Sequence, residues 1–166
     1  MNIANINILS SGPYTSIQDN GRIGFQSLGV PEGGVSDLDS FKIANALLEN
    51  NPNNAVIETY LGGLSFTIDK SIYISLTGSV SDRLLVTNGK KQEFFIESGE
   101  SKRVLSNSKI LLPQLVDSNS VIIGFSGSIL LPRIYNSKST STNAKLGGLK
   151  GRLLRDGDAF KLKINT

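Results

Sequence analysis

The first residues of the chain alternate between apolar and polar side chains. Ala4, Ile6 and Ile8 take every second position, and asparagines stand between them. Successive side chains of a β-strand point to opposite faces, so a period of two predicts a half-buried strand over residues 3–9.

A helical spacing of apolar residues occurs in one segment. Apolar side chains recur three and four positions apart from Leu38 to Leu48. Ser36 is placed to cap the first turn, where an acidic residue adds a favourable charge. Asn51-Pro52 follows, and proline cannot continue a helix. The pattern predicts one principal helix that starts at the Ser36 cap and reaches Glu49.

From residue 55 onward, short apolar runs are separated by Gly, Asn and Asp. The expected strands are 55–61, 64–68, 71–76, 83–87, 91–96, 102–105, 109–112, 121–125, 129–131 and 159–164. Asn88-Gly89 separates two of them and is a strong signal for a β-hairpin. About ten strands and one helix within 166 residues predict a single, mainly β domain, either a barrel or a closed sandwich.

The segment from Gly12 to Gln26 is rich in glycine and polar residues, and we expect it to be a loop. Gln18, Asp19 and Arg22 allow two interpretations. They form either a structural brace, in which the arginine bridges backbone and carboxylate, or a polar wall that orients an amide or carboxylate substrate. We expect the loop to fold inward over the barrel opening.

Glu58 stands in the middle of an expected strand, between Ile57 and Thr59. Its side chain therefore points to one face of a sheet. Inside a barrel mouth it would be a candidate general base, whereas on the outer face it would be a solvated strand residue.

The chain contains neither cysteine nor histidine. A disulfide framework, a thiol nucleophile and an imidazole base are therefore excluded. A zinc site would need carboxylates alone, so we expect no metal site. Any acid–base chemistry in this chain falls to Asp, Glu, Lys or Tyr, or to another subunit.

The net charge of +3 is unevenly distributed. Residues 1–60 hold two basic and six acidic side chains, whereas residues 61–166 hold fifteen basic and eight acidic ones. The basic C-terminal side chains are Lys138, Lys145, Lys150, Arg152, Arg155, Lys161 and Lys163. Nucleic-acid binding would require aromatic residues among them, and only Phe160 is present. They form either a solvated face or a pocket for an anionic substrate.

Two C-terminal segments lack an obvious core pattern. Residues 137–143 are rich in Ser and Thr without an apolar anchor, which predicts a loop that is mobile or that orders on a partner. The glycine-rich run 147–152 lacks the spacing of a nucleotide-binding loop, so we interpret it as a β-turn.

The first twelve residues carry no positive charge ahead of their short apolar run, so we do not expect a signal peptide. No window approaches the length of a membrane span. We therefore expect a cytoplasmic protein.

A series of motifs runs collinearly from about residue 9 to the end of the chain. The motifs are Gly12-Pro13, Gln18-Asp19-Asn20-Gly21-Arg22-Ile23-Gly24, Leu28-Gly29-Val30-Pro31, Ala44-Asn45, Ile57-Glu58, Leu61-Gly62-Gly63, Thr77-Gly78, Ser137-Lys138-Ser139-Thr140, Gly147-Gly148, Gly151-Arg152 and Gly157-Asp158. Together they resemble the biotin-dependent carboxyltransferase-like family. That family contains the C subunit of 5-oxoprolinase (also called the Kip antagonist protein), the second subunit of allophanate hydrolase and the carboxyltransferase region of urea amidolyase.

The resemblance implies a cyclophilin-like β-barrel with one principal α-helix. It implies that residues 1–166 form a single domain, equivalent to the N-terminal half of the family's two-half subunit. The implied partners are the other subunits of an oxoprolinase- or allophanate-hydrolase-type complex and a possible separate second half, without membrane or nucleic acid.

The resemblance also implies chemistry on a small amide or ureide. One form of the complex hydrolyses 5-oxoproline to glutamate with ATP, and another passes a carboxyl group from carboxybiotin to urea. ATP would act at the level of the complex, and we expect no cofactor on this chain. The alternative is a non-catalytic regulatory module that sequesters a partner protein, as in the Kip antagonist.

The motif series and the polar loop together predict the site residues. We expect Asp19 and Glu58 to be catalytic. The expected substrate-binding residues are Gln18, Arg22, Gln26, Gly34, Ser36, Lys138 and Arg152.

The chain departs from the family pattern in this loop. Ser27 stands where the family commonly has histidine, and residues 31–37 lack the usual serine and methionine of Pro-x-Ser-Gly-Ala-Met-Asp. These changes remove hydrogen-bonding groups that a substrate would use, so we do not expect catalysis by the chain alone.

Overall fold

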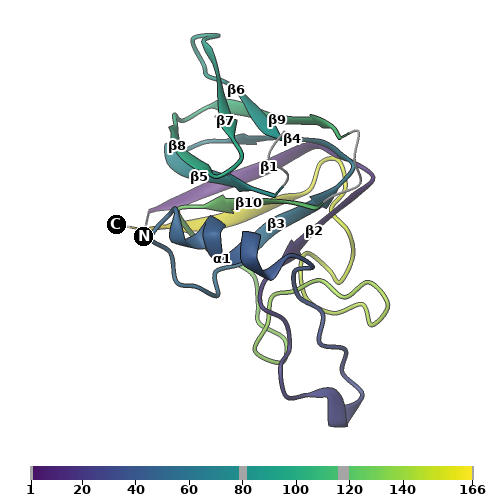
Figure 1. The fold of residues 1–166 in the computed structure, drawn as a ribbon. Coiled ribbons are helices and arrows are strands. Elements are labelled where there is room, and N and C mark those ends of the chain that lie inside the picture. The colour runs from purple at the N-terminus through teal and green to yellow at the C-terminus, as the bar shows by residue number, and fades with distance from the viewer. Residues whose placement is uncertain (1, 79–81, 116–119, 166) are drawn as a thin grey trace.

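A computed structural model describes residues 2–78, 82–115 and 120–165, and the strands of these ranges form two antiparallel sheets (Figure 1). The seven-stranded sheet has the order β11 (Gly127–Ile129), β12 (Ala159–Ile164), β1 (Ile3–Ser11), β4 (Gly62–Ile68), β9 (Ser108–Gln114), β6 (Arg83–Thr87) and β7 (Glu93–Glu97). The five-stranded sheet has the order β2 (Tyr14–Gln18), β3 (Val56–Tyr60), β10 (Ser120–Phe125), β5 (Ile72–Thr77) and β8 (Glu100–Val104). The fold is mainly β and barrel-like, as expected.

The two sheets enclose one apolar core. Ala4, Ile6 and Ile8 of β1 are buried in it, which confirms the half-buried strand expected from the alternation. Phe125 lies at its centre, with ring centroids 5.8 Å from Phe66 and 6.5 Å from Phe160 in edge-on geometry. These rings join β10 of one sheet to β4 and β12 of the other, and their burial stabilises the packing of the two sheets.

The chain crosses between the sheets at two corners that pack together. One corner links β1 to β2 and contains Gly12, and the other links β3 to β4 and contains Leu61 and Gly62. Gly12 has φ +67°, and a Cβ there would lie 2.1 Å from the carbonyl oxygen of Gly62. Only glycine permits this approach, which places β2 and β3 side by side in the second sheet.

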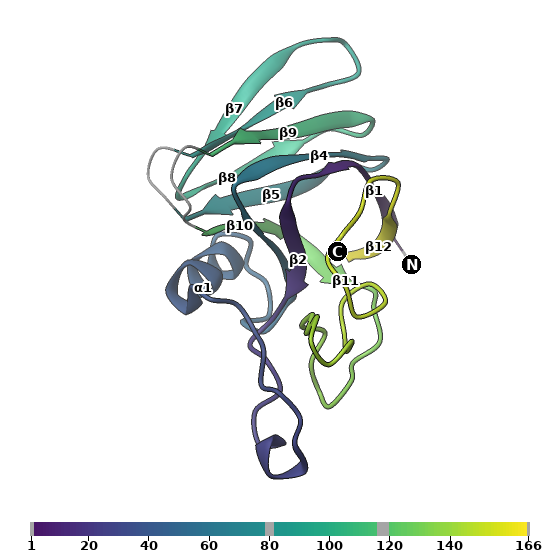
Figure 2. The same ribbon diagram turned by 90° about the vertical axis from the view of Figure 1, so that its right-hand side faces the viewer.

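The α-helix α1 (Leu38–Ala46) covers the outer face of the five-stranded sheet (Figures 1 and 2). Phe41 and Ala44 pack there against Val56 and Ile122. The expected Ser36 cap was wrong by one residue, because the Asp37 carboxylate accepts the Ser40 N–H at 3.0 Å. No helix in the described ranges has the length and apolarity of a membrane span.

The structure differs from the expected strands in two further places. The segment taken as a loop contains strand β2, which pairs with β3 and buries Ile17. The hairpin between β6 and β7 is present, but its connection spans residues 88–92. The Asn88 side chain accepts the N–H groups of Lys90 and Gln92 there, and Lys91 adopts φ 61°, so the tight two-residue turn does not form.

Residues 21–34 form an arm that projects from the body of the molecule (Figures 1 and 2). At its base the Arg22 N–H donates to the carbonyl oxygen of Glu32 at 2.7 Å. Its tip carries the short 3₁₀ helix η1 (Gln26–Leu28). The Phe25 ring packs against the Tyr135 ring, with centroids 5.2 Å apart, so the arm contacts the segment between β11 and β12.

The close approach at the sheet corner predicts a specific sensitivity. Gly12→Ala adds a clash to an unfavourable φ, so we expect it to lower the free energy of unfolding by at least about 3 kcal/mol. Gly24→Ala, in the arm, is the matched control, because its φ is +91° and nothing lies within 4 Å of the added atom. That variant should cost only about 1 kcal/mol. Urea denaturation of both variants measures the difference, and equal losses would contradict the corner model.

Candidate functional site

A polar cavity of about 220 Å³ opens between strands β2 and β3, the base of the arm and residues 140–143. Its lining residues are Tyr14, Ser16, Gln18, Gly33, Gly34, Ser36, Glu58, Tyr60, Thr140, Ser141, Thr142 and Asn143. Four residues expected at the site, Gln18, Gly34, Ser36 and Glu58, therefore come together here. The volume lies below the range of drug-sized ligand pockets, so it suits only a ligand of a few heavy atoms.

Glu58 lies at the centre of β3, paired in register with Ser16 of β2. The residue is 3% exposed. Oε1 accepts the Ser36 N–H at 2.9 Å and the Ser36 hydroxyl at 2.5 Å. Within the described ranges Oε2 has no hydrogen-bond partner, although Glu58 lines the cavity. Two bonds thus orient the carboxylate through Oε1.

Two tyrosines stand beside this carboxylate. Tyr14 and Tyr60 pack edge-on, with ring centroids 5.4 Å apart. Burial raises the pKa of Tyr60, the Ser36 hydroxyl opposes that rise, and the charge of Glu58 adds to it. The phenol therefore stays protonated near neutral pH and offers the cavity a hydrogen-bond donor.

The Gln18 amide fastens a distant segment to the end of β2. Its Nε2 donates to Ser16 Oγ at 2.9 Å and to the Thr140 carbonyl oxygen at 3.2 Å. Its Oε1 accepts the Ser139 hydroxyl. The residue lines the cavity as expected, but these partners already occupy most of its hydrogen-bonding capacity.

Asp19 is buried behind the cavity wall instead of facing the cavity. Its carboxylate accepts the Ser137 hydroxyl at 2.5 Å, the Lys138 N–H at 2.7 Å and the Gly21 N–H at 2.9 Å. Residues 137–140 are all buried and held in place by the protein itself. The expectation of a loop that is mobile or waits for a partner was therefore wrong for these four residues.

Arg22 lies behind the same wall and is completely buried. Nη2 donates to the Ser139 carbonyl oxygen, while Nε and Nη1 have no partner among the described residues. Burial lowers the pKa of the guanidinium, and the charge of Asp19 opposes that shift. The side chain braces backbone, as one of the two interpretations held, but it forms no ion pair with Asp19 within the described ranges.

The glycine run behind the wall is needed for close packing. Gly147 has φ +64°, and a Cβ there would lie 2.0 Å from the Ser139 carbonyl oxygen. This backbone thus presses against residues 139 and 140, which supports the interpretation as a turn over that of a phosphate cradle.

The structure does not bring Gln26 or Lys138 to the cavity. Gln26 is exposed on the arm and donates to Glu32 Oε2 at 2.7 Å. The Lys138 ammonium points into the protein, where it donates to the Ile129 carbonyl oxygen and to Ser128 Oγ. Burial lowers the pKa of Lys138, the nearby Arg133 lowers it further, and Asp19 opposes both effects.

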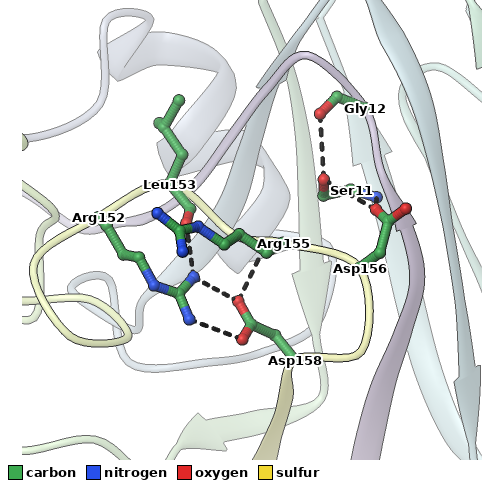
Figure 3. A network of polar contacts seen from close by, with 7 residues as sticks. All are labelled: Ser11, Gly12, Arg152, Leu153, Arg155, Asp156 and Asp158. Atoms are coloured by element: carbon green, nitrogen blue, oxygen red, sulfur yellow. Dashed lines mark hydrogen bonds and ion pairs between the residues drawn. The ribbon is translucent and has the colours of Figure 1, made fainter.

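Arg152 is also occupied elsewhere, in a turn that precedes β12 (Figure 3). Its guanidinium makes a two-pronged ion pair with Asp158, at 2.7 and 2.9 Å. The bond from Arg152 holds the pKa of the Asp158 carboxyl below its usual value. Asp156 of the same turn accepts the Ser11 N–H at 2.8 Å, which fastens the turn to the end of β1.

Several cavity residues were not expected from the sequence. The strand period offered a signal for some of them: Tyr14 and Ser16 alternate with buried neighbours in phase with Gln18, and Tyr60 follows Glu58 by two positions. Thr140–Asn143 had no such signal: Gln18 and the Ile17 carbonyl oxygen hold Thr140, and Ser141 pairs with Leu146. In the described part of the chain, no three His, Cys, Asp or Glu side chains gather as metal ligands.

The buried Asp19 carboxylate predicts a large loss of stability on truncation. Asp19→Ala leaves three donors without an acceptor, so we expect the free energy of unfolding to fall by about 3 kcal/mol. Asp39→Ala is the control, an exposed acid in the first turn of α1, and should cost about 0.5 kcal/mol. Hydrogen exchange at residues 138–140 should speed up in the first variant alone; unchanged protection would contradict the brace.

Comparison with known proteins shows which family the chain belongs to. The family model described as carboxyltransferase domain, subdomain A and B, matches residues 28–166. The 5-oxoprolinase C subunit of Escherichia coli is 30% identical over 157 residues, which are 95% of this chain and 49% of that protein. Urea amidolyase of Saccharomyces cerevisiae is 32% identical over 161 residues, 96% of this chain and 8% of that protein.

A solved structure gives the same result. The crystal structure of the Kluyveromyces lactis urea carboxylase superposes with a TM-score of 0.85 at 26% identity, over 95% of this chain and 14% of that one. The chain spans about half the length of the 5-oxoprolinase relative and a small part of the urea amidolyase. On the family match, the chain belongs to the carboxyltransferase domain, subdomain A and B, family.

Proposed function

We propose that this chain is a subunit, or half of a subunit, of an ATP-dependent complex that acts on a small amide or ureide. The complex would be of the 5-oxoprolinase or allophanate-hydrolase type. The relatives named above support this proposal, since one is a component of 5-oxoprolinase and another is a urea amidolyase. The observation that carries it is the Glu58 carboxylate, with one oxygen held by Ser36 and the other left to the cavity.

Glu58 would act as the base or the orienting group. An oxygen that is free of protein donors can accept an amide N–H or take a proton from an attacking water. The Ser36 bonds keep the carboxylate from turning, so the position of the accepting oxygen is set before a substrate binds. The phenol of Tyr60, which lies on the same strand as Glu58, would donate a hydrogen bond to the carbonyl oxygen of the substrate.

Asp19, Gln18 and Arg22 would support this chemistry indirectly. Each binds a group in residues 137–140, which lead directly into the cavity wall at Thr140–Asn143. We therefore propose them as positioning residues. ATP would be bound by the other subunits in the cytoplasm, and a second half would complete the subunit.

The proposal predicts the effect of removing the carboxylate charge. In a complex reconstituted from this chain, its partner subunits, ATP and 5-oxoproline, Glu58→Gln should lower kcat for glutamate formation by about 100-fold or more, the usual contribution of a general base. Glutamate release is measured with and without ATP.

Glu32→Gln is the matched control, since it alters an exposed carboxylate on the arm and should retain activity. The far-ultraviolet circular dichroism of both variants checks that they fold. Full turnover by Glu58→Gln would rule out its role as a base.

The projecting arm favours a second candidate, a regulatory module that binds a partner protein without turnover. Leu28 is 70% exposed and Ile23 is 63% exposed on the arm. Apolar side chains held away from the core on a braced loop are suited to insertion into a partner.

This alternative predicts that the arm carries the affinity for the partner. Ile23→Ser with Leu28→Ser should weaken binding to the partner protein by about tenfold or more, because two apolar contacts are lost. Tyr73→Ser is the control, an exposed aromatic residue on β5, away from the arm. Calorimetry measures the affinity of both variants for the partner protein. Binding by the unaltered chain without any ATP-dependent amide turnover would favour the module, and unchanged binding by the double variant would exclude the arm as the contact.

A further inference from the structure

We infer that the cavity selects the N–H side of its ligand and rejects carboxylates, so that a substrate with both groups enters with its amide or ureide end first. This inference deepens the proposed function and rests on the cavity being the small-amide site. It follows from the charges around the cavity, which differ from those expected from the sequence.

The cavity has a carboxylate and no basic side chain in its lining. Glu58 is the charged member of the lining set. The three cations expected to bind an anion are absent from this lining, although two buried nitrogen atoms of Arg22 have no partner among the described residues. Arg22 is buried against the Ser139 carbonyl oxygen, Lys138 binds the Ile129 carbonyl oxygen, and Arg152 pairs with Asp158.

A carboxylate ligand would therefore meet a like charge without a compensating cation. Two carboxylates at contact distance cannot both stay ionised without a large energetic cost. An amide or ureide NH₂ group instead donates directly to Glu58 Oε2, and a hydrogen bond to a charged acceptor is stronger than one between neutral groups.

The rest of the lining can serve the ligand's carbonyl oxygen. Tyr60 stays protonated and can donate to it, and Ser16, which already accepts from Gln18, retains a hydroxyl proton. Asn143 also lines the cavity and offers an amide. An acceptor with donors beside it matches the polarity of an amide, which carries NH₂ and C=O on one carbon.

This arrangement assigns the two ends of a bifunctional substrate. The amide end would lie on Glu58, and an anionic end would point out of the cavity. A cation that holds the anionic end must then come from a partner protein or from another part of the same protein.

Acetamide and acetate test the inference, because they have nearly the same shape and differ in the group that Glu58 would contact. Each is titrated into the full ¹⁵N-labelled chain while amide signals are followed. Acetamide should shift the signals of Ser36, Tyr60 and Thr140 in a saturable manner. Acetate at equal concentration should leave these signals in place. Binding of acetate as tight as that of acetamide, or binding of neither, would overturn the inference.

Glu58→Gln provides the decisive variant. Its side-chain oxygen can still accept both Ser36 bonds, which turns the new NH₂ group toward the cavity. Acetamide should bind about tenfold more weakly or worse, and the preference should shift toward acetate. An unchanged preference would overturn the inference, and the comparison of the two ligands on the unaltered chain stands even if this variant fails to fold.

These results are separable from the proposed function. Selective acetamide binding together with a reconstituted complex that shows no ATP-dependent amide turnover would support the inference and reject the proposed function. Amide turnover by a complex whose cavity prefers acetate would reject the inference alone.

Discussion

The buried carboxylate of Asp19 is the interaction on which the candidate site depends. It accepts two bonds from Ser137 and Lys138, more than a hundred residues further along the chain, and one from Gly21 beside it. A buried carboxylate costs free energy unless donors satisfy it, so the two segments can only be buried together. Residues 140–143 stand at the cavity as a consequence of this pairing.

The sheets contribute the opposite wall. The glycine corner at Gly12 sets β2 beside β3, and their register places Ser16 opposite Glu58. Ser36 reaches the same carboxylate from the segment between the arm and α1. Strands β2 and β3, the segment before α1 and residues 140–143 thus meet at one cavity, although they are far apart in the sequence.

How much of the structure can be predicted from the sequence depends on whether an element is set by neighbouring residues or by residues far away in the chain. The strand at residues 3–9, the helix after Ser36 and the hairpin at Asn88 have local patterns, and all three are present. Asp19 and Arg22 were expected at the site, but the structure places them behind it, because their partners at residues 137–139 cannot be identified from spacing. The prediction that Lys138 and Arg152 bind substrate failed for the same reason, since a basic residue in a sequence does not reveal which acceptor it binds.

Because the chain has no histidine, the placement of its basic residues outside the cavity decides the charge of the site. With no imidazole in the chain, Glu58 is the acidic side chain in the described lining of the cavity. It owes its open oxygen to Ser36, which binds only Oε1. The basic residues that could have balanced its charge instead stabilise loops, where they fix the wall and the turn before β12. The same side chains that give the site its shape thereby leave it with a net negative charge, and that charge determines which end of a ligand can enter.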